Sequence, residues 1–151
     1  MGSDAIKRTL LRGGIVIAAA FIVFTAYILV VNALRLRQVR NCADLQTLTF
    51  TVEAFHEKTG RYPHSIVEAV AASGMAPQNK KYFSSSRDAW GNPYLYAQRA
   101  DAFILVSYGR GGQPDGIDYW HQTVQEGGEL CRNLSADIFA NRSGVVRCCG
   151  K

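Results

Sequence analysis

Three histidines in the 151-residue sequence are the first candidates for metal chemistry. His56 is followed by Glu57, as in a zinc-binding protease helix, but such a helix needs a second histidine four residues on so that both rings face one ion. Gly60 occupies that position. We therefore expect His56, His64 and His121 to be surface or capping residues rather than metal ligands.

Motifs of the common enzyme classes are missing from the sequence. It contains no Gly-x-Ser-x-Gly elbow, no phosphate-binding P-loop and no dinucleotide-binding glycine pattern. The sequence thus predicts that the protein is not an enzyme and needs no organic cofactor.

The four cysteines offer a second kind of chemistry. Their even number in a small domain is compatible with disulfides formed in an oxidising compartment, and the adjacent pair at the C-terminal end lacks the Cys-x-x-Cys spacing of a redox site. We expect at least one disulfide, most plausibly between one of that pair and Cys131, with Cys42 as another partner. A closed loop of about 17 residues would add roughly 3 kcal/mol. The candidates are Cys42, Cys131, Cys148 and Cys149.

The chain is organised around an apolar run from Gly13 to Leu34 that carries no charged residue. A helix of about 22 residues reaches about 33 Å, enough to cross a hydrocarbon core of about 30 Å. A buried helix of a soluble protein would seldom be so long and uncharged. A cleaved signal peptide would have a shorter core. The run therefore predicts a transmembrane helix over residues 13–34, which leaves residues 1–12 as a tail or leader.

The net charge of +5 is concentrated at the two ends of this span. Residues 1–40 carry the whole excess, while residues 41–151 contain equal numbers of acidic and basic side chains. Such flanks favour contact with anionic lipid headgroups. A neutral remainder gives no electrostatic footprint for DNA or RNA, so we expect membrane lipid and no nucleic acid as partners.

The same helix is predicted to continue over residues 35–59, because no Pro or Gly interrupts it before Gly60 and Pro63. Its apolar residues recur at three- and four-residue steps, which favours a stripe covered by a small domain. We expect the intervening polar residues, including Asp44, to face water. The stripe consists of Leu45, Leu48, Val52 and Phe55.

The remaining pattern predicts one small α+β domain over residues 35–151. A capping box at Ser65 opens a short helix that ends at Gly74, and a loop with Pro77 follows. Alternation at 94–96 and 102–107 predicts two antiparallel strands, and a glycine-rich loop covers 109–116. Weaker strand candidates lie at 117–124, 136–140 and 145–146. The fold class is a long helix packed against a small antiparallel sheet.

Three stretches together resemble a known superfamily. They are Phe55-His-Glu-Lys-Thr-Gly-Arg-Tyr-Pro63, Asp88-Ala-Trp-Gly-Asn-Pro-Tyr-Leu-Tyr96 and Phe103-Ile-Leu-Val-Ser-Tyr-Gly109. Behind an apolar helix they resemble the type IV pilin-like proteins, most closely the major pseudopilin of type II secretion systems, over about residues 13–116. We expect the motif residues to shape turns rather than carry out a reaction. They are Gly60, Tyr62, Pro63, Asp88, Trp90, Gly91 and Pro93.

The resemblance implies a pilin-like fold and a structural role. The chain would be a subunit of a pseudopilus or related assembly that acts by helix packing, with itself, other pseudopilins or inner-membrane secretion components as partners. Alternatively, it is an unpolymerised binding protein or minor pilin that displays residues 109–135 to a ligand. It would cross the inner membrane once, with a cytoplasmic N-terminus and a periplasmic domain.

The N-terminal segment departs from the family pattern. Family leaders end in Gly before a methylated Phe, and a Glu stands at the fifth mature position, where this chain has Ala18 or Ala19. We therefore expect residues 1–12 to be retained and the helix to associate through its small residues. The candidate assembly residues of the span are Ala18, Ala19 and Ala26.

The loop after the strands departs as well. Major pseudopilins bind calcium at Ser-x-Gly-x-Asp-Gly and further acids, whereas here Gly111 replaces the Asp. A hard cation needs six or more oxygens, which acids later in the chain and backbone carbonyls from Ser107 onward would have to supply. The weaker calcium candidates are Ser107, Asp115, Asp118 and Asp137.

Overall fold

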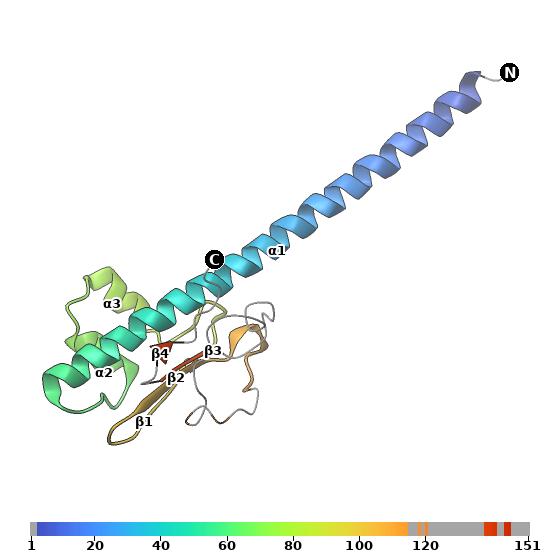
Figure 1. Cartoon of the computed structure of the whole chain (residues 1–151). Helices are drawn as coiled ribbons and strands as arrows, with labels where there is room; N and C mark the ends of the chain where they lie inside the picture. The colour runs from blue at the N-terminus through green and yellow to red at the C-terminus, as the bar shows by residue number, and fades with distance from the viewer. Residues whose placement is uncertain (1–2, 115–117, 119, 121–137, 142–143, 146–151) are drawn as a thin grey trace. The chain divides into compact units, whose positions relative to one another are not determined.

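A computed structural model describes residues 3–114, 118, 120, 138–141 and 144–145 of the chain. The elements are labelled in Figure 1, beginning with the long helix α1, Ser3–Thr59. The chain divides into two compact units, Met1–Arg35 and Leu36–Lys151. Each unit is described by itself.

The first unit is helical from Ser3 to Arg35, and its residues from Gly13 to Val30 are exposed. Its large side chains are exposed, as in Ile17 and Phe21, at 73% and 70%. In the described part of the chain one helix is long and apolar enough to cross a membrane, and its most apolar window lies near the N-terminus. These residues have the composition of a single membrane anchor.

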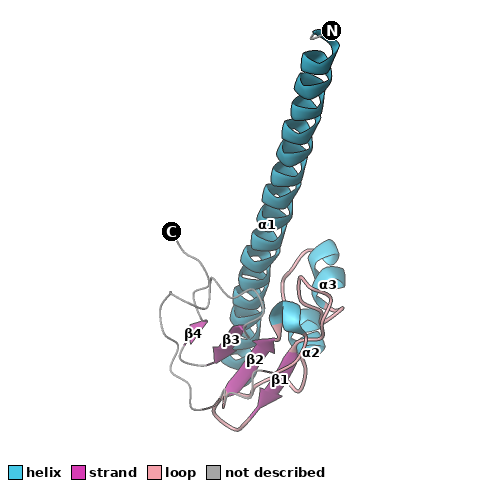
Figure 2. Ribbon diagram, turned by 90° about the vertical axis from the view of Figure 1, so that its right-hand side faces the viewer, coloured by secondary structure: helices cyan, strands magenta, loops and turns pink. Residues whose placement is uncertain are grey.

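The second unit is an α+β domain with a pilin-like fold. The outer part of α1 is followed by α2 (Ile66–Ala72) and α3 (Pro77–Phe83), then by an antiparallel sheet in the order β1-β2-β3-β4 (Figure 2). The strands are β1 (Leu95–Gln98), β2 (Phe103–Ser107), β3 (Ile138–Asn141) and β4 (Gly144–Val145), and a short 3-10 helix, η1 (Gly109–Gly111), follows β2. The strand predictions at 94–96 and 102–107 are confirmed to within a few residues, and those at 136–140 and 145–146 are confirmed at the described residues 138–140 and 145. Of the candidate at 117–124, residues 117, 119 and 121–124 lie outside the described residues, and 118 and 120 are not in a strand.

The core of this domain forms between α1 and the sheet. All five residues of β2 are buried, and its two faces belong to different clusters. Phe103 and Leu105 join the stripe of α1, together with α2, whereas Ile104 and Val106 pack with Phe139 on the other face. A strand buried on both faces explains why its sequence is an unbroken apolar run. The buried residues of the α1 stripe are Leu45, Leu48, Val52 and Phe55.

Two sequence predictions for this region are wrong. Asp44 does not face water, since only 9% of its surface is accessible to solvent. The segment predicted as a loop with Pro77 contains helix α3, which starts at that proline. Proline suits the first turn of a helix because its missing N–H would have no partner there. The two corrections are linked, because α3 carries the partner of Asp44.

Candidate functional site

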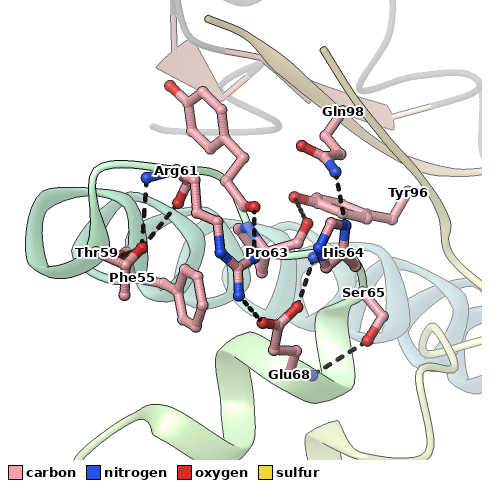
Figure 3. Close-up of polar contacts among 10 residues, drawn as sticks. Phe55, Thr59, Arg61, Pro63, His64, Ser65, Glu68, Tyr96 and Gln98 are labelled. Carbon is pink, nitrogen blue, oxygen red and sulfur yellow. Dashed lines mark hydrogen bonds and ion pairs between the residues drawn. The ribbon is translucent and has the colours of Figure 1, made fainter. Parts of the chain in front are cut away.

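The end of α1 forms the first polar junction of the domain (Figure 3). Gly60 takes φ +74° and donates its N–H to His56 O at 2.8 Å, as expected of a C-terminal cap. The chain then reverses, and Tyr62 is buried between Phe103 and His56, whose ring stacks on it at a centroid distance of 4.2 Å. The turn motif is therefore part of the core.

A hydroxyl from the sheet fixes this turn. Tyr96 in β1 donates its hydroxyl to Pro63 O at 2.9 Å, across 33 residues of sequence (Figure 3). Burial raises the pKa of Tyr96 above its ordinary range, so this hydroxyl remains a donor at neutral pH. The contact joins the loop after α1 to the first strand.

The start of α2 is built on the predicted cap. Ser65 accepts the N–H of Glu68 at 3.2 Å, while the Glu68 carboxylate accepts the N–H of His64 at 2.6 Å and pairs with Arg61 Nη2 at 2.6 Å. The hydrogen bond from Arg61, and then that from the backbone of His64, lowers the pKa of Glu68. His64 Nδ1 lies 3.1 Å from Gln98 Nε2. Of the three histidines, His56 and His64 thus belong to this junction, and His121 lies outside the described residues.

The second polar junction is a loop folded around Asp88. One carboxylate oxygen of Asp88 accepts the backbone N–H groups of Trp90 at 2.9 Å and Asn92 at 2.8 Å, which closes a tight turn. Gly91 has φ +90°, a conformation that a side chain would strain. Trp90 is half-buried, and the Arg37 guanidinium lies 5.7 Å from its ring centroid. The exposed Pro93 forms an isolated antiparallel β-bridge with Arg87.

A buried hydroxyl connects this loop to α1 and to the sheet. Ser107 Oγ, at the end of β2, donates to the second oxygen of Asp88 at 2.6 Å and accepts from Asn41 Nδ2 at 2.6 Å and from the N–H of Gly109 at 3.2 Å. Asn41 and Ser107 are fully buried. Tyr94 completes the contact by donating to Asn41 Oδ1 at 3.3 Å. We call Asn41, Asp88 and Ser107 the buried polar triad.

The triad bears on the calcium candidates. A hydroxyl has one donor and two acceptor positions, and all three positions of Ser107 are filled, so its side-chain oxygen is not available as a cation ligand. Asp118 accepts the N–H of Trp120 at 3.1 Å. Asp115 and Asp137 lie outside the described residues. Calcium binding stays a prediction.

A third contact joins α1 to α3. Tyr82 donates its hydroxyl to Asp44 Oδ2 at 2.5 Å, and Arg40, one turn earlier on α1, lies 3.8 Å from the same oxygen. Burial raises the pKa of Asp44 against the opposing effects of Tyr82 and Arg40. No local sequence pattern indicates this pair, because Tyr82 lies in α3, where a loop was predicted.

An apolar groove runs along the domain surface between α1 and the end of α2. It has a volume of about 670 Å³ and is lined by Thr47, Phe50, Ala54 and Lys58 of α1 and by Ala72 and Met75 beyond it, among others. Phe50 is 65% exposed although it is a large aromatic residue. None of the polar contacts above gives this groove a role.

The predicted assembly residues are divided between the units. Ala18, Ala19 and Ala26 are exposed in the first unit. Cys42 is half-buried and packs against the domain core. The other disulfide candidates, Cys131, Cys148 and Cys149, lie outside the described residues.

The comparisons with known proteins agree with this fold. The family model described as type II secretion system (T2SS), protein G matches residues 32–125, more than half of the chain. The matched segment contains both polar junctions and the first two strands. No curated protein and no solved structure matches. The chain therefore belongs to the family of type II secretion system protein G, the major pseudopilin.

Proposed function

We propose that the protein is a membrane-anchored structural subunit of a pseudopilus or related secretion assembly, and that it acts by helix–helix packing rather than catalysis. One observation carries the proposal. The chain belongs to this family, and its helix α1 exposes large apolar side chains over residues 15–30, a stretch that contains no charged residue. Such a surface requires lipid or neighbouring helices around it.

The small residues of the span favour neighbouring helices as part of that cover. Ala19 and Ala26 are seven residues apart on one face and are both exposed. Small side chains let two helix backbones approach closely within a membrane. Because no acidic residue lies in the span, packing there leaves no buried carboxylate to be neutralised. Retained basic residues before the span would hold its N-terminus at the cytoplasmic surface.

We further propose that the domain lies on the periplasmic side and contains a disulfide with Cys42 as one member. An oxidising compartment is the usual setting for structural disulfides. The three arginines after the span, Arg35, Arg37 and Arg40, are exposed and would meet anionic headgroups. Non-reducing mass spectrometry of protein from its native compartment should find fewer than four free thiols. Four free thiols would contradict the disulfide.

Crosslinking in the membrane tests the assembly. Single photo-reactive residues at Ala19 and Ala26 should give dimers and higher species in the full-length protein. The same probe at the exposed Arg87, in the domain and outside the span, is the control for random collision. Electron microscopy of cells overproducing the protein should then show filaments. Absence of adducts at both alanines would favour the unpolymerised binding protein that displays residues 109–135.

Two further measurements test topology. A reporter active only in the cytoplasm, fused after Lys151, should stay inactive if the domain is periplasmic. The mass of the purified protein should include residues 1–12. A mass that matches cleavage after Gly13 or Gly14 would refute the retained leader without affecting the orientation.

A further inference from the structure

The charges of the domain are separated along its part of α1. The first residues of this part, 36–43, contain Arg37 and Arg40 and no acidic residue. The acidic residues near the C-terminal end of the helix are Glu53 and Glu57. The positive charge of this helix segment therefore lies at the end that follows the membrane span in sequence, although residues 41–151 are neutral as a whole.

Helix α3 adds to this basic end. The segment 75–87 around it contains three basic residues and no acidic one, and α3 lies nearer than α2 to the start of the domain's part of α1 (Figures 1 and 2). Tyr82 of α3 contacts Asp44 and Arg40 of α1. Lys81, next to Tyr82, is exposed and makes no hydrogen bond or ion pair within the described residues. Its ammonium group is thus available to a partner.

Both arginines of this end lie over aromatic rings of the domain. The Arg40 guanidinium is 5.0 Å from the Tyr82 ring centroid, and the Arg37 guanidinium is 5.7 Å from that of Trp90. A guanidinium over a ring is held in place through its face, so the N–H groups at its edge can still donate to phosphate oxygens. Arg40 Nε is 3.8 Å from Asp44 Oδ2, too far for a hydrogen bond. We call Arg37, Arg40 and Lys81 the basic surface.

We propose that the basic surface binds the phosphate groups of anionic phospholipids in the membrane that holds the anchor, so that α3 makes a second membrane contact. The inference rests on the proposed function, because it requires the apolar span to lie in the bilayer. Arg40 follows Leu34, the last residue of that span, by six residues, about 9 Å along a helix. This distance is comparable with the Debye length at physiological salt, and the chain sets it whatever the direction of the domain.

Two exposed apolar side chains beside the basic surface favour lipid over a soluble anion. Leu36 is 70% exposed and Val39 is 50% exposed. Leu36 is one turn from Arg40, on the same face of α1. Basic side chains next to aromatic and apolar ones are typical of a helix at a bilayer interface. A soluble phosphate would contact the charges alone and leave both apolar side chains uncovered.

Fluorescence quenching tests the contact in the full-length protein, reconstituted into vesicles. A fluorescent amino acid is incorporated at Asn79, which is exposed in α3, and the quencher is phosphatidylcholine with a spin label on its headgroup. We expect quenching in vesicles that contain phosphatidylglycerol, and its loss in pure phosphatidylcholine or at high salt. The control position is Ala100, exposed between β1 and β2, where quenching should not depend on the lipid.

Charge removal tests the residues. Lys81→Gln should lower the ratio of docked to undocked α3 about fivefold, the effect of one cation near an anionic surface. Its urea midpoint should equal that of the native protein, because Lys81 makes no hydrogen bond or ion pair within the described residues. Lys58→Gln is the matched control, since it removes an exposed lysine near the C-terminal end of α1. Equal quenching at Asn79 in the two kinds of vesicle, or equal effects of the two lysine variants, would overturn the inference.

The anchor is measured separately. Resistance of the protein to extraction by alkaline carbonate, together with the crosslinks at Ala19 and Ala26, reports on the proposed function. If these results are positive and position 79 is not quenched, the lipid contact of α3 alone is refuted. If carbonate extracts the protein, the proposed function falls together with this inference.

Discussion

Replacing Ser107 by alanine should destabilise the domain far more than the loss of one hydroxyl on the surface. Its oxygen makes three hydrogen bonds, to Asp88, Asn41 and Gly109, and the residue is fully buried. After Ser107→Ala, the amide of Asn41 and the N–H of Gly109 lose their acceptor.

The magnitude follows from these contacts. A buried donor left without a partner costs about 1–3 kcal/mol, and a hydrogen bond to a charged group contributes about 1.5–3 kcal/mol. Because the three bonds share one oxygen and their losses are not additive, we expect a total near 3 kcal/mol. Ser85→Ala is the matched control, since its exposed hydroxyl makes a single local bond of 2.8 Å to Tyr82 O. Its cost should stay below about 0.5 kcal/mol.

Urea unfolding of the full-length protein in detergent, followed by tryptophan fluorescence, measures both variants. Trp90 belongs to the loop that Asp88 closes and reports on it directly. A double-mutant cycle with Asn41→Ala adds a second criterion, because Ser107→Ala should cost less in that background by about 1 kcal/mol. Equal losses for Ser107→Ala and Ser85→Ala, or strict additivity in the cycle, would refute the triad as a cooperative unit.

Four further outcomes are expected. Gly60→Ala should cost about 1 kcal/mol because its φ is +74°, whereas Gly74→Ala, which also meets no atom within 4 Å, should cost nothing measurable; equal urea midpoints would contradict the backbone argument. Since burial raises the pKa of Asp44, the folded state holds this proton more tightly than the unfolded state. The stability of the native protein relative to Asp44→Asn should therefore fall as pH rises from the unfolded pKa of about 3.9 through the higher folded one. The pKa of Glu68 is lowered by Arg61, so relative to Glu68→Gln stability should be lost as pH falls through the folded pKa, and slopes of equal sign in the two titrations would disprove this assignment. Finally, Tyr96→Phe should cost about 1 kcal/mol through its bond to Pro63, and a variant as stable as the native protein in the same urea assay would show that the bond contributes nothing.

Periodicity predicted most of the fold correctly. The stripe from Leu45 to Phe55 is buried because its three- and four-residue steps keep one face of a helix apolar. Helix α2 was predicted from its capping box, and β2 from its apolar run. These features are local, and a single sequence shows them directly.

The polar contacts could not be predicted in the same way, since their partners are distant in sequence. Asn41 and Ser107 are 66 residues apart, and Asn41 belongs to none of the three motif stretches. Asp44 read as a water-facing residue because its partner lies in a seven-residue helix with Phe83 as its one buried residue, too short to show a period. The groove was not predicted because its threonines are polar in sequence. Only the structure shows that each hydroxyl donates to a carbonyl of its own helix.

The buried polar triad also determines the rotational phase of α1 within its domain. Successive residues of a helix are about 100° apart, so a shift of one residue would turn Asn41 away from Ser107 and leave buried polar groups unpaired. An apolar stripe alone tolerates such a slip more easily, because one hydrophobic side chain can replace another. By fixing which side of the helix faces inward, Asn41 also fixes which side faces out, and thus the direction in which Phe50 is presented. A substitution inside the domain could in this way change the orientation of an outer surface with which it has no contact.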